Sequence, residues 1–235
     1  MIEITDEVRD QISAPARRDD HEGDGATRGT SRMEAYADAV FAIAFTLPVV
    51  HILLPHPKPG FDLGDHLIKL WPSYFGYALA SAVIGLYWVH HHFSGAIYRT
   101  TGHWFLVATV VFLAAIGFIA FPARALGDYI WVADSQPAAA QYWVVSCTLL
   151  AWTWVFKWTV GLKRDQVDSR LDPAYVTRLN YRYWTFAGLN TVAAALAFWS
   201  WEIGLTLSGL VTLTLVWPPE TPRYRTVAPV VEGES

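Results

Sequence analysis

Three ionisable residues, Arg32, Glu34 and Asp38, open a segment that then stays apolar as far as Leu54. In a helix, Asp38 would lie about 9 Å along the axis from Arg32, because each residue adds ~1.5 Å. A carboxylate at that depth in a bilayer is costly and usually serves a function. Acids near the start of a helix also complement the positive end of its dipole without any further role. The spacing leaves both interpretations open.

A second polar group, Trp88, His90, His91 and His92, lies near the end of another apolar segment. Adjacent residues of a helix point about 100° apart, so the three histidines cannot converge on one metal ion. No cysteine or carboxylate completes a tetrahedral set with them. The sequence also lacks the nucleophile–base spacing, glycine-rich phosphate loop and paired acids that enzymes use. We therefore expect no metal, no cofactor and no enzymatic activity.

The elements that must position these residues are long apolar helices. Hydrophobic residues make up 53% of the 235 residues and charged residues only 16%. The net charge of −4 is small and the basic residues form no extended patch, which argues against nucleic-acid binding. Each long apolar window is near the ~20 residues that a spanning helix needs. We expect an all-α membrane protein with six transmembrane helices, at about 34–54, 72–93, 103–125, 138–161, 183–201 and 203–217.

Polar segments flank the predicted transmembrane region, 31–217. Residues 1–30 contain few large apolar side chains and cannot fold alone, and residues 218–235 carry four prolines, so we expect both segments to be disordered. An even number of spans places the two termini on one side, together with 14 of the Lys and Arg residues, against 3 on the other side. The positive-inside rule then predicts a multi-pass protein of the cell membrane with cytoplasmic termini.

Two blocks of the sequence resemble the prokaryotic branch of the transmembrane protein 175 family of potassium channels. The stretch Arg32-Met-Glu-Ala-Tyr-Ala-Asp38 is similar to the family signature Arg-x-x-x-Phe-Ser-Asp, with Tyr36 and Ala37 in place of the usual Phe and Ser. The segment from Trp71 to His92 is similar to the second helix of that branch. The resemblance implies a six-helix subunit that assembles as a homotetramer, with the first helix of each subunit lining a central pore. Pro48 departs from the pattern, because it removes a backbone hydrogen bond inside that helix and favours a kink.

A stripe of apolar residues runs along one face of the first helix. Ile43, Leu47, Val50 and Leu54 are spaced i, i+4, i+7 and i+11, which by itself indicates packing against lipid or protein. The family resemblance instead implies that Ile43, Leu47 and Val50 form the pore constriction. It also implies that the hydroxyl of Thr46 forms a selectivity layer beside them. Without the resemblance, Thr46 is expected to bond a carbonyl of its own helix.

The resemblance also implies a network that ties the first helix to its neighbours: Arg32, Asp38, Trp88, His91 and His92. Asp38 needs a hydrogen-bond donor if it is ionised below the membrane surface, and Trp88 and His92 share a helix face. Read without the family, Trp88 is an interfacial anchor and the histidines belong to a solvated helix end.

These observations predict a potassium-selective cation channel whose partners are potassium ions, the lipid bilayer and three further copies of the chain. A secondary transporter that uses Asp38 as a proton or cation site is the alternative. A membrane protein with a structural role only is the third possibility. Steady ohmic current would favour the channel, and saturating coupled flux the transporter.

Overall fold

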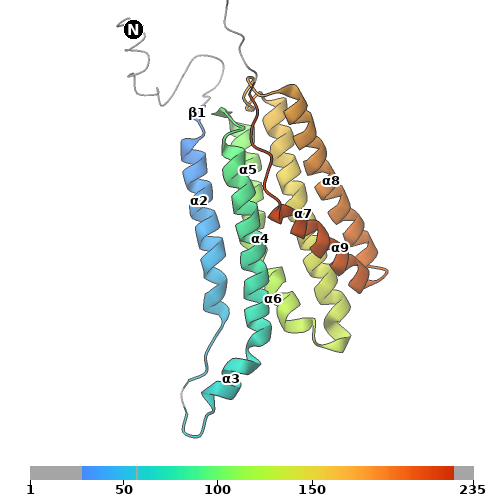
Figure 1. Cartoon of the computed structure of the whole chain (residues 1–235). Coiled ribbons are helices and arrows are strands. Elements are labelled where there is room, and N and C mark those ends of the chain that lie inside the picture. Colours follow the sequence, from blue (N-terminus) through green and yellow to red (C-terminus); the bar gives the residue numbers. More distant parts are fainter. Residues whose placement is uncertain (1–27, 57, 225–235) are drawn as a thin grey trace, which may run out of the picture.

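The computed structural model describes residues 28–56 and 58–224, which form a bundle of helices (Figure 1). The helices are α2 (Ser31–Thr46), α3 (Leu63–Lys69), α4 (Trp71–Gly95), α5 (His103–Phe118), α6 (Ala120–Tyr129), α7 (Gln136–Lys163), α8 (Pro173–Ala197) and α9 (Trp201–Leu213), with 3-10 turns η1 (Leu47–His51), η2 (Ala133–Ser135) and η3 (Thr214–Val216). Two short strands, β1 (Arg28–Gly29) and β2 (Thr100–Thr101), pair antiparallel with Arg28 opposite Thr101.

Helix α7 lies inside the bundle and α2 lies at its edge (Figure 1). In the apolar window of the α7 segment 61% of the residues are buried, whereas in that of α2 the share is 22%. Helix α2 packs against α4 and α5, and α8 and α9 pack against α7. An apolar helix that its own chain covers so little has most of its surface free for lipid or for another subunit.

The helix boundaries follow the predicted apolar segments with four differences. Helix α2 gives way to η1 at Leu47, next to Pro48, whose ring disfavours continued α-helical bonding. The segment predicted at 103–125 is divided at Ile119 into α5 and α6. Helix α8 begins at Pro173 instead of residue 183, because Asp172 caps it by accepting a hydrogen bond from the backbone N–H of Ala174 at 3.0 Å. The turn into α9 comes at Phe198–Ser200, just before the junction between the predicted spans 183–201 and 203–217.

Three segments of the described chain are long and apolar enough to cross a membrane: Ser31–Val50, His103–Tyr129 and Ala133–Lys163. The pair α3 and α4, which is bent by 47°, adds a fourth if it counts as one span. Helix α9 with η3 is apolar but shorter. Helix α8 carries Arg178 and Arg182 in its first half, which lowers its hydropathy. Length and composition therefore support a membrane protein but not by themselves the predicted number of six spans.

Close backbone contact joins α4 to α6. A Cβ atom added at Gly127 would lie 2.6 Å from the carbonyl oxygen of Pro72 and 2.9 Å from the backbone nitrogen of Gly76. Any larger side chain at Gly127 would force these helices apart, which is the usual reason for small residues between membrane helices. Around this contact the core combines aromatic and aliphatic side chains of α2, α4, α5 and α7.

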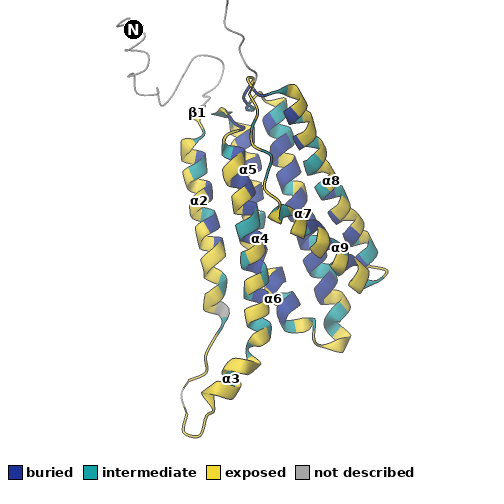
Figure 2. Ribbon diagram, viewed as in Figure 1, coloured by how far each residue is buried: buried dark blue, intermediate teal, exposed yellow. Residues whose placement is uncertain are grey.

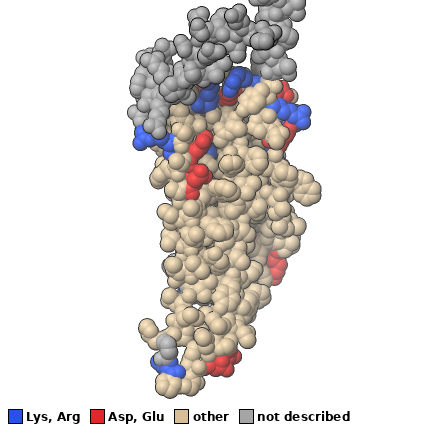
Figure 3. Space-filling view, turned by 60° about the vertical axis from the view of Figure 1, so that its left-hand side comes forward, with Lys and Arg blue, Asp and Glu red and all other residues tan. Residues whose placement is uncertain are grey.

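Most of the charged side chains in view gather at the two ends of the molecule, and on this face the only charged atoms in view in the broad belt between them are acidic ones at its right-hand edge (Figure 3). At the end nearest the termini, the connection between α7 and α8 is held to that between α4 and α5. The backbone N–H of Arg99 donates to Gln166 and that of Asp168 donates to Ile97, both at 2.9 Å. Arg170 Nη2 donates to Asp168 Oδ2 at 2.6 Å, which lowers the pKa of Asp168 to about 2.

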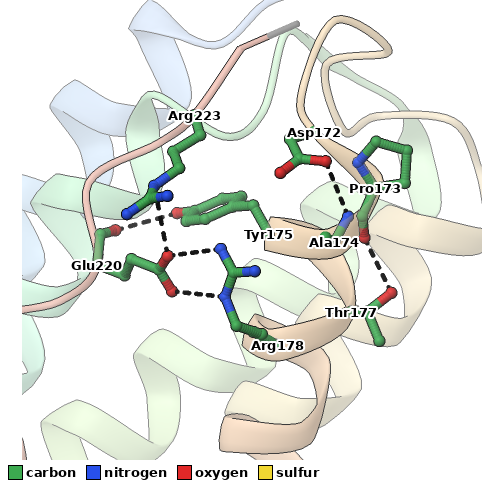
Figure 4. Close-up of polar contacts among 8 residues, drawn as sticks. All are labelled: Asp172, Pro173, Ala174, Tyr175, Thr177, Arg178, Glu220 and Arg223. Atoms are coloured by element: carbon green, nitrogen blue, oxygen red, sulfur yellow. Dashed lines mark hydrogen bonds and ion pairs between the residues drawn. The ribbon is translucent and has the colours of Figure 1, made fainter.

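Residues 218–224, which the sequence assigned to the disordered tail, lie against α8 and the α4–α5 connection. Glu220 accepts a hydrogen bond from Arg178 at 2.7 Å, and the Glu220 backbone carbonyl accepts one from the Tyr175 hydroxyl at 3.2 Å (Figure 4). The Tyr224 hydroxyl donates to the carbonyl of Ala96 at 2.9 Å. Arg28 and Gly29, from the other flanking segment, form β1. Residues 1–27 and 225–235 lie outside the described part of the chain, so the predicted disorder there remains a prediction.

Candidate functional site

Helix α2 has one buried and one exposed face, and both are apolar (Figure 2). Met33, Ala37, Phe41 and Ala44 are buried and follow the spacing of a single helix face. A soluble protein would place polar residues on the opposite face. Here that face carries large apolar side chains, so it requires an apolar or protein environment that the single chain does not supply.

The predicted constriction residues lie on this exposed face. Ile43, Leu47 and Val50 are each more than half exposed, with exposed fractions of 56%, 54% and 58%. Tyr36 lies on the same face seven residues before Ile43 and is 55% exposed. The stripe therefore runs from the region of Asp38 down to η1 without a charged residue between Ile43 and Val50.

Thr46 lies beside the stripe and is exposed. Its hydroxyl donates to the carbonyl of Ala42 at 2.8 Å, with a longer contact to the carbonyl of Ile43 at 3.3 Å. This is the bond within the helix that the residue type alone predicts. A hydroxyl that donates its proton keeps lone pairs that accept, so the oxygen still offers a ligand to water or to a cation.

A hollow of ≈ 520 Å³ separates the end of α2 from α4, α5 and α6. Ile43, Leu47 and Pro48 line it on one side, and Tyr77, Phe121 and Arg124 line it on the other. The end of α2 is thus loosely packed inside its own chain, whereas Phe41 and Ala37 are firmly buried. Of the predicted constriction residues, Ile43 at the end of α2 and Leu47 at the start of η1 border this hollow.

Asp38 is held by the indole of Trp88, whose Nε1–H donates to Asp38 Oδ1 at 3.1 Å. The ring centroid of His92 lies 5.8 Å from that of Trp88. Asp38, Trp88 and His92 therefore form one cluster that joins α2 to α4. The sequence prediction placed these three residues together.

Arg32 and His91 occupy other positions. Arg32 is exposed, and none of the residues that the structure describes forms a hydrogen bond or ion pair with it. His91 is buried; its ring is stacked with that of Phe112 at 6.0 Å and lies 5.4 Å from that of Phe41. His91 thus contacts α2 through ring packing with Phe41, and within the described residues it forms no hydrogen bond or ring contact with Asp38.

Lys157 is a buried cation. In the sequence it was only one of the 14 Lys and Arg residues expected on the side of the membrane that holds both termini. It is 1% exposed, and its Nζ lies 5.1 Å from the Trp154 ring centroid, 5.4 Å from that of Tyr98 and 5.5 Å from that of Phe112. No described hydrogen-bond partner reaches Nζ. Three aromatic faces therefore provide its stabilisation. The signal available in the sequence was an ionisable residue inside an apolar segment, which usually has a partner within the protein.

Among residues 28–56 and 58–224, no three His, Cys, Asp or Glu side chains gather closely enough to hold a metal ion. The exposed polar side chains of α2 are those of Ser31, Arg32, Tyr36, Asp38 and Thr46, and all of them except Arg32 offer oxygen atoms. The chemistry available along α2 is therefore that of a few oxygen ligands beside an apolar stripe.

Comparison with known proteins agrees with this geometry. The family described as "Endosomal/lysosomal potassium channel TMEM175" matches residues 32–120, which extend from α2 to the end of α5. A potassium channel from Chamaesiphon minutus is 33% identical over 174 residues, covering 72% of this chain and 84% of that protein. A potassium channel from Streptomyces collinus is 29% identical over 187 residues, covering 78% of this chain and 90% of that protein.

The fold also matches a solved structure. The crystal structure of a lysosomal potassium-selective channel TMEM175 homologue from Chamaesiphon minutus superposes with a TM-score of 0.65 at 28% sequence identity. The match covers 80% of this chain and 96% of that one. With one relative above 30% identity over most of its length and the same fold in a solved relative, the chain belongs to the TMEM175 family.

Proposed function

We propose that this protein is a potassium-selective channel of the cell membrane, formed by four copies of the chain with α2 of each copy lining the central pore. Relatives that carry the name potassium channel support the choice of ion. The observation that carries the proposal is the exposed apolar stripe of Ile43, Leu47 and Val50 on Ser31–Val50, the least buried of the three candidate spans. Four such stripes facing one axis would cover one another and leave a narrow apolar passage.

The constriction would act through hydration. A ring of Ile43, Leu47 or Val50 side chains offers no ligand to replace the water around a cation, so a narrow ring expels water and stops current, and a wider ring conducts. The hollow behind Ile43 and Leu47 gives these side chains space into which they can withdraw. Opening would then require a small displacement of the end of α2, next to η1.

Thr46 would supply the selectivity layer. Its bond to Ala42 directs the hydroxyl proton back along the helix, which leaves the lone pairs of the oxygen free. Four hydroxyl oxygens beside an apolar ring can share in the hydration of a passing cation. A potassium ion binds its water less tightly than sodium does, so partial replacement of water favours potassium.

The cluster of Asp38, Trp88 and His92 would fix α2 against α4. The rest of the chain would provide the other five of the six spans, with α8 and the shorter α9 completing the set. At ~1.5 Å per residue, the 25 residues of α8 reach about 37 Å, enough to span a bilayer. Both termini would be cytoplasmic, because the end that holds 14 of the 17 Lys and Arg residues faces the cytoplasm.

The test is the reversal potential of the purified full-length protein in a planar bilayer with potassium on one side and sodium on the other. A potassium-selective channel gives ohmic current that reverses close to the potassium equilibrium potential. Saturating flux coupled to protons, abolished in Asp38→Asn, would instead support the transporter. Current that reverses near zero would still support a pore but would contradict its selectivity for potassium.

A further inference from the structure

A second hollow lies on the flank of the bundle between α4, α7, α8 and the α9–η3 segment, with a volume of ≈ 360 Å³. No residue of α2 lines it. Its walls are mainly aromatic and aliphatic: Tyr87, Trp154, Phe186, Leu189, Val211 and Leu215. The volume is at the lower end of the range of small-molecule sites, about 300–1,000 Å³. We refer to it as the flank groove.

The groove wall formed by α8 changes from charged to apolar along the helix. Arg182, Phe186 and Leu189 follow one another at i, i+4 and i+7, so they share a face. Leu189 lies about 10 Å further along the axis than Arg182. Helix α8 begins at the end that holds the termini (Figure 1), so Arg182 lies nearer that end than Leu189 does. One end of the groove is therefore cationic and the other apolar.

The guanidinium of Arg182 is available to a ligand. Glu220 interacts electrostatically with Arg182, but Arg178 holds its carboxylate through hydrogen bonds at 2.7 and 3.3 Å (Figure 4). Arg223 also approaches Glu220, at 3.7 Å. The pKa of Glu220 is lowered, chiefly by its bond to Arg178, with Arg182 contributing only through its charge. In the described part of the chain Arg182 forms no hydrogen bond or ion pair, so three arginines surround one carboxylate and leave a net positive charge.

Apart from Arg182, the groove is lined mainly by apolar atoms, and the Thr214 hydroxyl already donates to the carbonyl of Val211 at 2.6 Å. His90 lies there, but its Nε2 is 2.8 Å from the carbonyl of Leu215 and is occupied by that contact. A molecule that suits the groove therefore carries a negative charge at one end and a hydrocarbon chain at the other.

We propose that the flank groove binds an anionic phospholipid, with the headgroup phosphate on Arg182 and an acyl chain along Phe186 and Leu189. Arginine pairs with phosphate oxygens through two parallel N–H donors. The lipid would enter from the leaflet at the end that carries the termini, where basic residues concentrate. Its chain would cover Tyr87 and Trp154 and link α4 to α8. The site lies apart from the α2 stripe and does not depend on ion conduction.

Binding is measured by native mass spectrometry of delipidated, purified full-length protein titrated with phosphatidylglycerol or phosphatidylcholine. We expect phosphatidylglycerol to bind more tightly, and Arg182→Gln to weaken it roughly fivefold, the factor that one cation near an anionic lipid contributes. Arg164→Gln is the matched control, because Arg164 is exposed at the same end but does not line the groove. Equal effects of the two variants would overturn the proposal.

Leu189→Trp provides an independent test, because it fills the apolar end and leaves every charge in place. We expect this variant to lose tight phosphatidylglycerol binding while keeping the oligomeric state of the wild type. Altered oligomeric state with unchanged lipid binding would show that a second copy of the chain covers the groove. Displacement of the lipid by millimolar inorganic phosphate would show an anion site without a lipid, and either result would overturn the proposal.

Discussion

The bond between Asp38 and Trp88 is the contact through which a single substitution should loosen α2 from the rest of the subunit. Asp38→Asn keeps the size and an acceptor oxygen but removes the charge. A hydrogen bond to a charged group contributes about 1.5–3 kcal/mol and a neutral one about 0.5–1.5 kcal/mol. The difference is about 1 kcal/mol, and because Asp38 and Trp88 are both partly open to solvent in the subunit, we expect the lower part of the range.

The assay is thermal unfolding of the purified protein, followed by intrinsic fluorescence, with the oligomeric state measured in parallel by size-exclusion chromatography. A loss of about 1 kcal/mol lowers Tm by roughly 2–4 °C in a chain of this size. Trp88→Phe should cause a similar loss, and the double variant should be no worse than either single one, because both remove the same bond. Arg32→Gln is the matched control, since it removes an exposed charge from the same helix without touching Trp88.

The ion current decides whether Asp38 acts through this bond. We expect Asp38→Asn to change stability or the open fraction while leaving the conductance of an open channel unchanged. If the variant is as stable as the wild type, opens identically and conducts less, Asp38 faces the ion. The proposal that Asp38 acts by fixing α2 against α4 would then be wrong. Additive losses in the double variant would also contradict a direct bond between the two side chains.

Substitutions at four further positions give distinct results. Thr46→Val should lower the potassium/sodium permeability ratio with total current in the same range, measured by reversal potentials. Ile43→Ala should raise the leak current and weaken selectivity in the same recordings. Lys157→Glu should lose about 3–5 kcal/mol of stability by placing a carboxylate against three aromatic faces, whereas Lys157→Met should fold, as thermal unfolding will show. Asp168→Asn should be less stable than wild type by about 1–2 kcal/mol at pH 7, a difference that disappears as pH falls from about 4 to 2.

The sign for Asp168 follows from its lowered pKa. Its ordinary pKa is 3.8 and its pKa in the folded chain is about 2, so the carboxylate stabilises the fold fully above about pH 4 and no longer does so below about 2. A difference that persists at pH 2 would contradict the role of the Arg170 ion pair.

Coincident reversal potentials of Thr46→Val and wild type would show that the bond to Ala42 is the whole role of that hydroxyl.

Hydropathy was sufficient to locate the helices that are apolar throughout. Helix α7 was predicted at 138–161 and lies at Gln136–Lys163, and α4 was predicted at 72–93 and lies at Trp71–Gly95. The start of α8 was missed because Arg178 and Arg182 interrupt its apolar pattern. Tertiary contacts stabilise that part of the helix, chiefly the bond from Arg178 to Glu220, 42 residues away in the sequence.

The candidate site was predicted in part, because residue type indicates a possible partner but not the direction of a side chain. The need of Asp38 for a donor pointed to Trp88, and the structure contains that bond. His91 and His92 were equivalent in the sequence, and only packing separates them: His91 stacks on Phe112 in the core, whereas His92 is exposed beside Trp88. Lys157 was missed because its burial depends on rings that come from three separate helices or loops.

The most direct test of the proposed pore is the accessibility of position 43 to a thiol reagent during conduction. The chain has one cysteine, Cys147, which is buried, so we expect the reagent to leave the current of the wild type unchanged. We predict that a cationic methanethiosulfonate reagent stops the potassium current of Ile43→Cys and leaves that of Phe45→Cys intact, because Phe45 points about 200° away around α2 and lies beside Gly85 of α4. Current through Ile43→Cys that the reagent does not change, together with block of Phe45→Cys, would contradict a pore lined by the stripe.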